Sequence, residues 1–96
     1  MTFREYLKES IDLRSISLVL NGKKNIQLKD ENDNNVEFTV KEEYLVDTVK
    51  RIEKLLKIKL KKEVKDSGDS EVYSANGYEF IFTEMKSGIN LLITKG

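Results

Sequence analysis

Cysteine and histidine are both missing from this sequence of 96 residues. Without cysteine the chain forms no disulfide and carries no thiolate nucleophile. Without histidine it lacks the usual general base and the commonest metal ligand. No apolar run approaches the ~18 residues that a membrane-spanning helix needs, and residues 1–9 are too acidic and too short in apolar length for a secretion signal. These absences weigh against most enzymes, so we expect a non-enzymatic protein with no cofactor, no metal site and no membrane partner.

The residues that are present fit one small folded domain. Hydrophobic residues make up 39% and charged residues 35% of the chain, a balance typical of globular rather than disordered proteins. A chain of this size buries roughly 65% of its surface on folding. No proline-rich linker divides the sequence, so we interpret residues 1–96 as a single domain.

The formal net charge is zero, with 17 basic and 17 acidic residues, but the charges are unevenly distributed. Residues 1–49 carry 7 basic and 10 acidic groups, residues 50–65 carry 8 and 2, and residues 66–96 carry 2 and 5. A basic block of net charge +6 therefore lies between two segments of net charge −3. The basic groups are 14 lysines and 3 arginines. Because lysine lacks the bidentate fork of arginine, this block is weak support for a specific nucleic-acid site.

The first third of the chain predicts a helix followed by a hairpin. Thr2 and Glu5 are spaced as a capping box, and they open a short helix over residues 1–10 with Phe3, Tyr6 and Leu7 on one face. Residues 15–20 alternate as a strand does, and Asn21-Gly22 is a strong hairpin signal. With Lys23 also in the loop, the predicted register pairs Leu18 with Ile26 and Ile16 with Leu28.

The middle of the chain predicts a third strand and a long helix. After a polar turn at residues 30–35, Val36, Phe38 and Val40 continue in phase with Ile26 and Leu28. A second capping box at residues 39–42 predicts an amphipathic helix over residues 41–57. The apolar stripe of this helix recurs at spacings of 4, 3 and 4, in Leu45, Val49, Ile52 and Leu56. Residues 58–65 alternate as a strand, although Leu60 and Val64 also continue the helical stripe, and we prefer the strand.

The C-terminal third predicts a meander. A turn at residues 66–69 leads to a strand at residues 71–75, and the Asn76-Gly77 hairpin then pairs Tyr73 with Phe80 and Val72 with Ile81. The loop around residues 86–88 pairs Phe82 with Leu91 and Phe80 with Ile93. The expected fold is therefore α+β. We expect an antiparallel sheet of six to seven strands in two meanders, with the long amphipathic helix packed on one face.

Three groups of residues are candidates for binding. Asp30, Asn32 and Asn34 alternate as in a calcium loop, but the required glycine is Asn35 and the twelfth position is Lys41 instead of glutamate, so we interpret residues 30–35 as a solvated turn. Tyr44 and Tyr78 are candidate interface aromatics. The third group is a basic ridge that can contact phosphates or an acidic partner. With Tyr44, its predicted partner-binding residues are Lys50, Arg51, Lys54, Lys57 and Lys61.

The shape of this ridge depends on the structure after residue 57. Lys50, Lys54, Lys57 and Lys61 form one stripe on a continuous helix, whereas Lys57, Lys59 and Lys61 share a face if residues 58–65 are a strand. The solvent side of an ordinary helix has a similar composition. No aromatic residue is interleaved with the lysines, so stacking of single-stranded bases is not indicated.

Phe3, Tyr6, Leu7 and Glu9 follow an apolar-x-x-apolar-apolar-x-Glu pattern over residues 1–9. This pattern resembles the capsid-targeting leader of internal head proteins of T-even-type tailed phages, in which a maturation protease cuts after a Leu/Ile-x-Glu triplet. Leu7-Lys8-Glu9 is such a triplet, and the resemblance covers about a tenth of the chain. It implies a protein that is injected with the genome and acts on a host target by binding.

The leading hypothesis is therefore a small, phage-derived binding protein that modulates or inhibits a host protein in the host cytoplasm through the basic ridge. One alternative is a nucleic-acid-binding protein that uses the same ridge. Another is an internal or assembly protein that is packaged in the virion. Homo-oligomers through bare sheet edges are a further expectation.

Overall fold

The computed structural model describes residues 13–67 and 70–95. It contains helices α2 (Leu13–Leu20) and α3 (Leu45–Leu56) and strands β1 (Ile26–Glu31), β2 (Asn35–Val40), β3 (Lys61–Ser67), β4 (Ser70–Ala75), β5 (Tyr78–Met85) and β6 (Gly88–Lys95). The helix predicted over residues 1–10 lies outside the described residues, as do Gly68 and Asp69 of the predicted turn. Neither described helix is long and apolar enough to cross a membrane.

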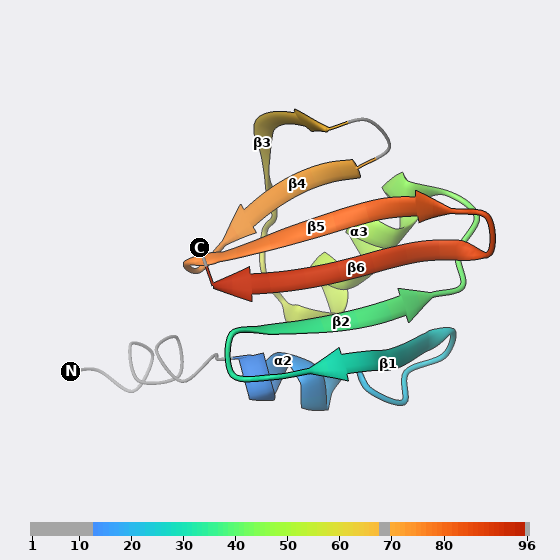
Figure 1. The fold of residues 1–96 in the computed structure, drawn as a ribbon, viewed down its shortest axis with the longest axis vertical. Helices are drawn as coiled ribbons and strands as arrows, with labels where there is room; N and C mark the ends of the chain where they lie inside the picture. Colours follow the sequence, from blue (N-terminus) through green and yellow to red (C-terminus); the bar gives the residue numbers. More distant parts are fainter. Residues whose placement is uncertain (1–12, 68–69, 96) are drawn as a thin grey trace.

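The strands form one open antiparallel sheet in the order β1-β2-β6-β5-β4-β3, as Figure 1 shows. Strands β3 to β6 make a single four-stranded meander, and the β1–β2 hairpin joins it because β2 pairs with β6. The α+β class and the antiparallel sheet are confirmed. The expectation of two meanders is wrong, because the segment predicted as the first strand is helical. The described residues form six strands, the lower of the two expected numbers.

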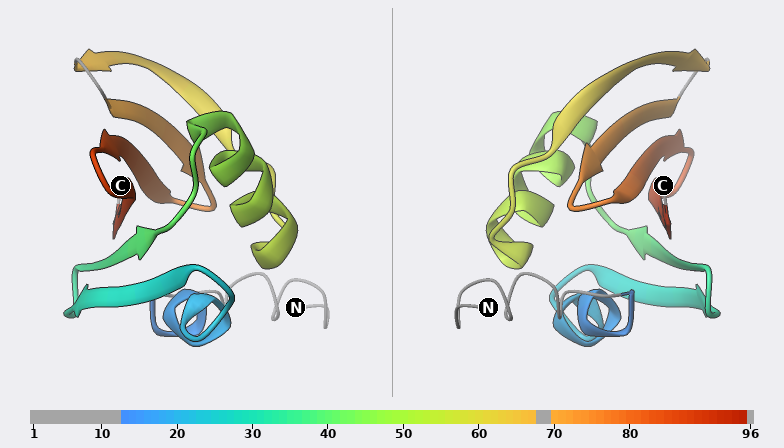
Figure 2. Two further views of the ribbon diagram at one scale, coloured as in Figure 1. Left: turned by 90° about the vertical axis from the view of Figure 1, so that its right-hand side faces the viewer. Right: turned by 90° about the vertical axis from the view of Figure 1, so that its left-hand side faces the viewer.

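Both helices lie on one face of the sheet (Figure 2). Helix α2 contacts β1 and β2, and α3 contacts β5 and α2. The buried residues under the helices belong to one apolar cluster, which includes three fully buried phenylalanines. These are Phe38, Phe80 and Phe82. The opposite face of the sheet carries no described helix, so the core has a single layer of helices over a single sheet.

Residues 13–20 correct the predicted strand at residues 15–20. Helix α2 buries Leu13, Ile16, Ser17 and Leu20, which recur at the 3 and 4 spacing of a helix. As a consequence Leu18 is 71% exposed, although the predicted strand pairs it with Ile26. The 21–25 segment therefore connects a helix to β1, and Ile26 pairs with Val40 instead.

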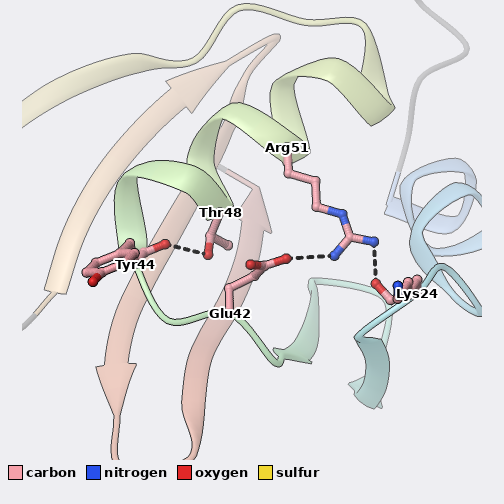
Figure 3. Close-up of polar contacts among 5 residues, drawn as sticks. All are labelled: Lys24, Glu42, Tyr44, Thr48 and Arg51. Atoms are coloured by element: carbon pink, nitrogen blue, oxygen red, sulfur yellow. Dashed lines mark hydrogen bonds and ion pairs between the residues drawn. The ribbon is translucent and has the colours of Figure 1, made fainter.

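The start of α3 also differs from the prediction. The capping box at residues 39–42 does not form, since Thr39 and Val40 belong to β2 and pair with β6. Tyr44 is the N-cap residue and its side chain makes no capping bond. Its carbonyl oxygen instead accepts hydrogen bonds from the backbone N–H of Thr48 and from Thr48 Oγ1, at 3.2 and 3.0 Å (Figure 3). Thr48 is fully buried, so these two hydrogen bonds hold the first turn of the helix against the core.

The predicted registers elsewhere are confirmed. Tyr73 pairs with Phe80 and Val72 with Ile81 across the β4–β5 hairpin. Phe80 pairs with Ile93 and Phe82 with Leu91 between β5 and β6. Between β1 and β2 only the phase of the apolar residues is predicted, and there Ile26 pairs with Val40 and Leu28 with Phe38, before a register shift at Lys29. The strand interpretation of residues 58–65 is confirmed from Lys61 onward, whereas residues 58–60 have no regular structure.

Candidate functional site

The lysines of the predicted ridge divide between α3 and the segment that follows it. Lys50 and Lys54 are exposed on α3, one helical turn apart. Lys57 follows the last residue of the helix in a left-handed conformation, with φ 56°. Lys59 and Lys61 are exposed on either side of buried Leu60. We call these five residues the lysine surface: Lys50, Lys54, Lys57, Lys59 and Lys61.

The chain after α3 turns back beside the helix before it enters β3 (Figure 2). The carbonyl oxygen of Glu53 accepts hydrogen bonds from the backbone N–H groups of Lys57 and Ile58, the second at 3.1 Å. The side chain of the same glutamate accepts a hydrogen bond from the N–H of Leu60 at 2.8 Å. Glu53 therefore holds the returning segment against the helix. This holds the segment that carries Lys59 beside the helix that carries Lys50 and Lys54.

Within residues 13–67 and 70–95, the five ammonium groups of the lysine surface have no hydrogen-bond or ion-pair partner. No ion pair joins any of them to another residue in the described part of the chain. Lys62, the next residue, differs because its Nζ lies 2.6 Å from Oε1 of Glu71 on β4. The lysine surface thus ends where the ion pairs of the sheet edge begin. Unpaired lysines on one surface make a positive potential that can attract an acidic partner.

Arg51 points into the molecule instead of joining the lysine surface. Its guanidinium lies 3.1 Å from Oε1 of Glu42 and also donates to the backbone carbonyl of Lys24 (Figure 3). The side chains of Arg51 and Glu42 are both about a quarter exposed, at 26% and 27%. The arginine therefore ties α3 to two loops, the one that precedes it and the one that joins α2 to β1.

Two exposed apolar side chains lie at the N-terminal end of α3. Tyr44 is 62% exposed, and its ring is directed away from the Glu42–Arg51 pair (Figure 3). Val46 is 58% exposed and lies one helical turn before Lys50. Val46 is not among the residues that the sequence analysis selects for binding. An outward apolar position next to lysines is a signal for an interface, which often joins an apolar centre to a charged rim.

Tyr73 is the one described residue with a clearly shifted pKa. Burial raises the pKa of its phenol above the ordinary value of 10.0, and the negative charge of Glu71 raises it further. Its hydroxyl lies 3.5 Å from Oε1 of Glu71, and its ring meets that of Phe82 edge to face at 5.5 Å. The phenol is therefore held in its neutral, protonated form, which suits packing and does not create a nucleophile.

The other two sequence candidates lie elsewhere. The oxygen of the Asn32 side chain accepts hydrogen bonds from the N–H groups of Asn34 and Asn35, at 2.8 and 2.9 Å, and closes the β1–β2 turn. Among the described residues no group of three or more acidic side chains is arranged to hold a metal ion. Tyr78 is half-buried at the start of β5 and packs against the core cluster.

The chain was also compared with known proteins. No family model, curated protein or solved structure matches it.

Proposed function

We propose that this chain is a non-enzymatic binding protein that modulates another protein through the lysine surface. The observation that carries the proposal is a group of five exposed lysines that form no ion pair within the described residues. Glu53 holds the segment that carries Lys59 against α3. In this proposal α3 is an amphipathic helix, with its apolar side in the core and its lysines toward the partner. The complementary partner is an acidic protein surface.

Val46 and Tyr44 favour a protein partner over a nucleic acid. A protein interface combines an apolar, often aromatic, centre with a charged rim, and these two side chains provide apolar area beside the lysines. Nucleic-acid surfaces rely on arginine for bidentate contacts and on interleaved aromatics for stacking. Arg51 is engaged inside the molecule, so the lysine surface has neither feature.

The sheet edges are poor sites for a partner strand. The exposed residues of β1 are mostly charged, and its register shifts at Lys29. The register of β3 also shifts after Lys62, and its first three residues are charged. Charged and irregular edges oppose the addition of another strand. We therefore assign binding to the helix side and not to an oligomer through the edges.

The target that we propose is a host protein of a phage-infected cell. The support is the resemblance of residues 1–9 to a phage capsid-targeting leader, carried by Phe3, Tyr6, Leu7 and Glu9. The same resemblance is the support for packaging in the virion. Both rest on the sequence of a segment outside the described residues.

The test is a charge reversal with a matched control. The immobilised full chain is used to recover partners from host extract, and the K50E/K54E/K57E variant should retain less than a tenth of the specific partner. The control K23E/K41E/K86E makes the same change in net charge at exposed lysines of three loops, and it should retain the partner. Equal retention by all three proteins would show that the surface is wrong.

A gel-shift titration separates the nucleic-acid alternative. If the lysine surface binds duplex DNA or RNA, the affinity should fall steeply between low and physiological salt, and K50E/K54E/K57E should abolish the shift. The proposal predicts no specific shift for either nucleic acid. A strong, salt-dependent shift that only this triple substitution removes would replace the protein partner by a nucleic acid.

A further inference from the structure

A polar pocket of about 330 Å³ lies where the loop between α2 and β1 meets the end of β2. The start of β1 and the end of β2 lie side by side there (Figure 1). Two ammonium groups, two side-chain amides and one hydroxyl line the pocket. They belong to Lys23, Lys41, Asn25, Gln27 and Thr39. The volume lies within the range of small-molecule sites, which begins near ~300 Å³, and the lining suits a charged, polar ligand.

The five polar side chains of the pocket have no other task in the described fold. Four of them are exposed and Thr39 is half-buried. Within the part of the chain that the structure describes, none of the five makes a side-chain hydrogen bond or ion pair. No acidic residue is among the described residues that line the pocket. Glu37 and Glu42, which flank Thr39 and Lys41 in the sequence, are each paired with another cation, at 4.0 and 3.1 Å. The pocket therefore presents a positive potential.

Hydrogen bonds hold the backbone that carries the two lysines. The backbone N–H of Lys41 donates to the carbonyl oxygen of Asn25 at 2.8 Å, and that of Ile26 donates to the carbonyl oxygen of Lys23 at 3.0 Å. The guanidinium of Arg51 binds the same loop from α3. The loop is thus fixed to the sheet and to a helix without any ligand. A framework that is ordered in advance lowers the entropy cost of binding.

We infer that this pocket binds the phosphoryl group of a small phosphorylated molecule. Ammonium groups bind phosphate oxygens as point charges, and the amides of Asn25 and Gln27 and the hydroxyl of Thr39 can donate to the remaining oxygens. A carboxylate has two oxygens and leaves more of these donors without an acceptor. A nucleic acid is bound by a groove of cations that follows its backbone, whereas this pocket holds a single pair of lysines.

The pocket is separate from the lysine surface. Gln27 and Thr39 are opposite each other in the register and alternate with Ile26 and Val40, which are buried in the core under the helices. Their side chains therefore lie on the sheet face away from α3. The inference does not rest on the proposed function, and the two fail separately. K23E/K41E/K86E should lose phosphate binding and keep the protein partner, whereas K50E/K54E/K57E should do the reverse.

The test is a titration of the full chain with sodium phosphate at pH 8, where inorganic phosphate is chiefly a dianion. We expect saturable shifts of the backbone amide signals of Lys23, Gln27 and Lys41, which sodium chloride at the same ionic strength does not produce. K23Q/K41Q should bind phosphate about tenfold more weakly, because it removes both charge-assisted contacts. The matched control K24Q/K86Q makes the same change in charge at exposed lysines outside the pocket lining, and it should retain the affinity.

Three outcomes would overturn the inference. Shifts that do not saturate, or that chloride reproduces, would show that the pocket holds no phosphate. Equal affinities of K23Q/K41Q and K24Q/K86Q would show that the two lysines do not form the site. Sodium acetate that binds as tightly as phosphate would replace the phosphoryl group by a carboxylate. All of these substitutions change exposed side chains, so thermal denaturation should show unaltered stability in both variants.

Discussion

The backbone N–H of Leu60 donates a 2.8 Å hydrogen bond to Oε2 of Glu53, seven residues earlier in the chain. Leu60 is buried, whereas Lys59 and Lys61 on either side of it are exposed. One carboxylate therefore holds the backbone between two exposed lysines. Glu53, which interrupts the basic block in the sequence, ties the segment after α3 to the helix.

Replacing Glu53 should loosen this segment. We expect E53A to lower the free energy of unfolding by about 1–2 kcal/mol, because the Leu60 amide loses its acceptor. E53Q should lose much less, since its side-chain oxygen can still accept the bond. E43A is the control, as it removes the same charge from an exposed position before α3. Urea denaturation measures all three, and equal stability of E53A and E43A would contradict this role of Glu53.

A pair of substitutions in α2 tests the helix that replaced the predicted strand. Ser17 is buried and Leu18 is exposed. S17Q should lower the free energy of unfolding by about 2–3 kcal/mol through crowding and polar burial. L18Q should change it by no more than about 0.5 kcal/mol. A strand that pairs Leu18 with Ile26 requires the reverse order of the two losses, and thermal denaturation distinguishes them.

Residues 13–20 show why a local sequence pattern can predict a strand where the fold has a helix. Ile16, Leu18 and Leu20 are apolar at every second position, and Asn21-Gly22 follows them as in a hairpin. Residues 15–20 therefore match the pattern of a β-strand. Including Leu13 makes Leu13, Ile16 and Leu20 a helical series. The choice depends on docking against β1 and β2, which is a tertiary contact. A short apolar run does not contain that information.

The register of the C-terminal meander was predictable because its turn residues and the apolar pattern of its strands indicate the same pairing. Asn76 and Gly77 both have positive φ, as a two-residue hairpin turn requires. That turn fixes the register that pairs Tyr73 with Phe80. For the candidate site, exposure of the lysines was foreseeable from the spacing of residues 50–57. The inward direction of Arg51 was not, because Glu42 and Lys24 meet it only in the folded chain.

Of the three glycines in the described part of the chain, Gly88 is the one at which a side chain has no room. Its φ is 144°, and an added Cβ would lie 2.6 Å from the backbone oxygen of Val40 on β2. G88A should therefore lower the free energy of unfolding by about 3 kcal/mol, through backbone strain and displacement of β2. Gly22 also has a positive φ, 85°, but open space around it. G22A should cost about 1 kcal/mol, and a G88A variant no less stable than G22A would refute the close approach.

The raised pKa of Tyr73 predicts a loss of stability in alkali. Because burial and Glu71 raise the pKa in the folded state, the neutral phenol favours folding. This contribution is complete below the unfolded pKa of about 10 and is lost as the pH rises through the folded value. Unfolding followed from pH 8 to 11.5 should therefore show a smaller decline in Y73F than in the unsubstituted chain. Identical declines would contradict the shift.

The central claim is that Lys50, Lys54 and Lys57 contact a protein partner. Its most direct test is the dissociation constant of the purified partner, measured by calorimetry against the unsubstituted chain, K50E/K54E/K57E and K23E/K41E/K86E. The two variants carry the same net charge, so they separate a local contact from a general charge effect. We predict at least tenfold weaker binding for K50E/K54E/K57E alone. Unchanged affinity in that variant, or an equal loss in both, would contradict the claim.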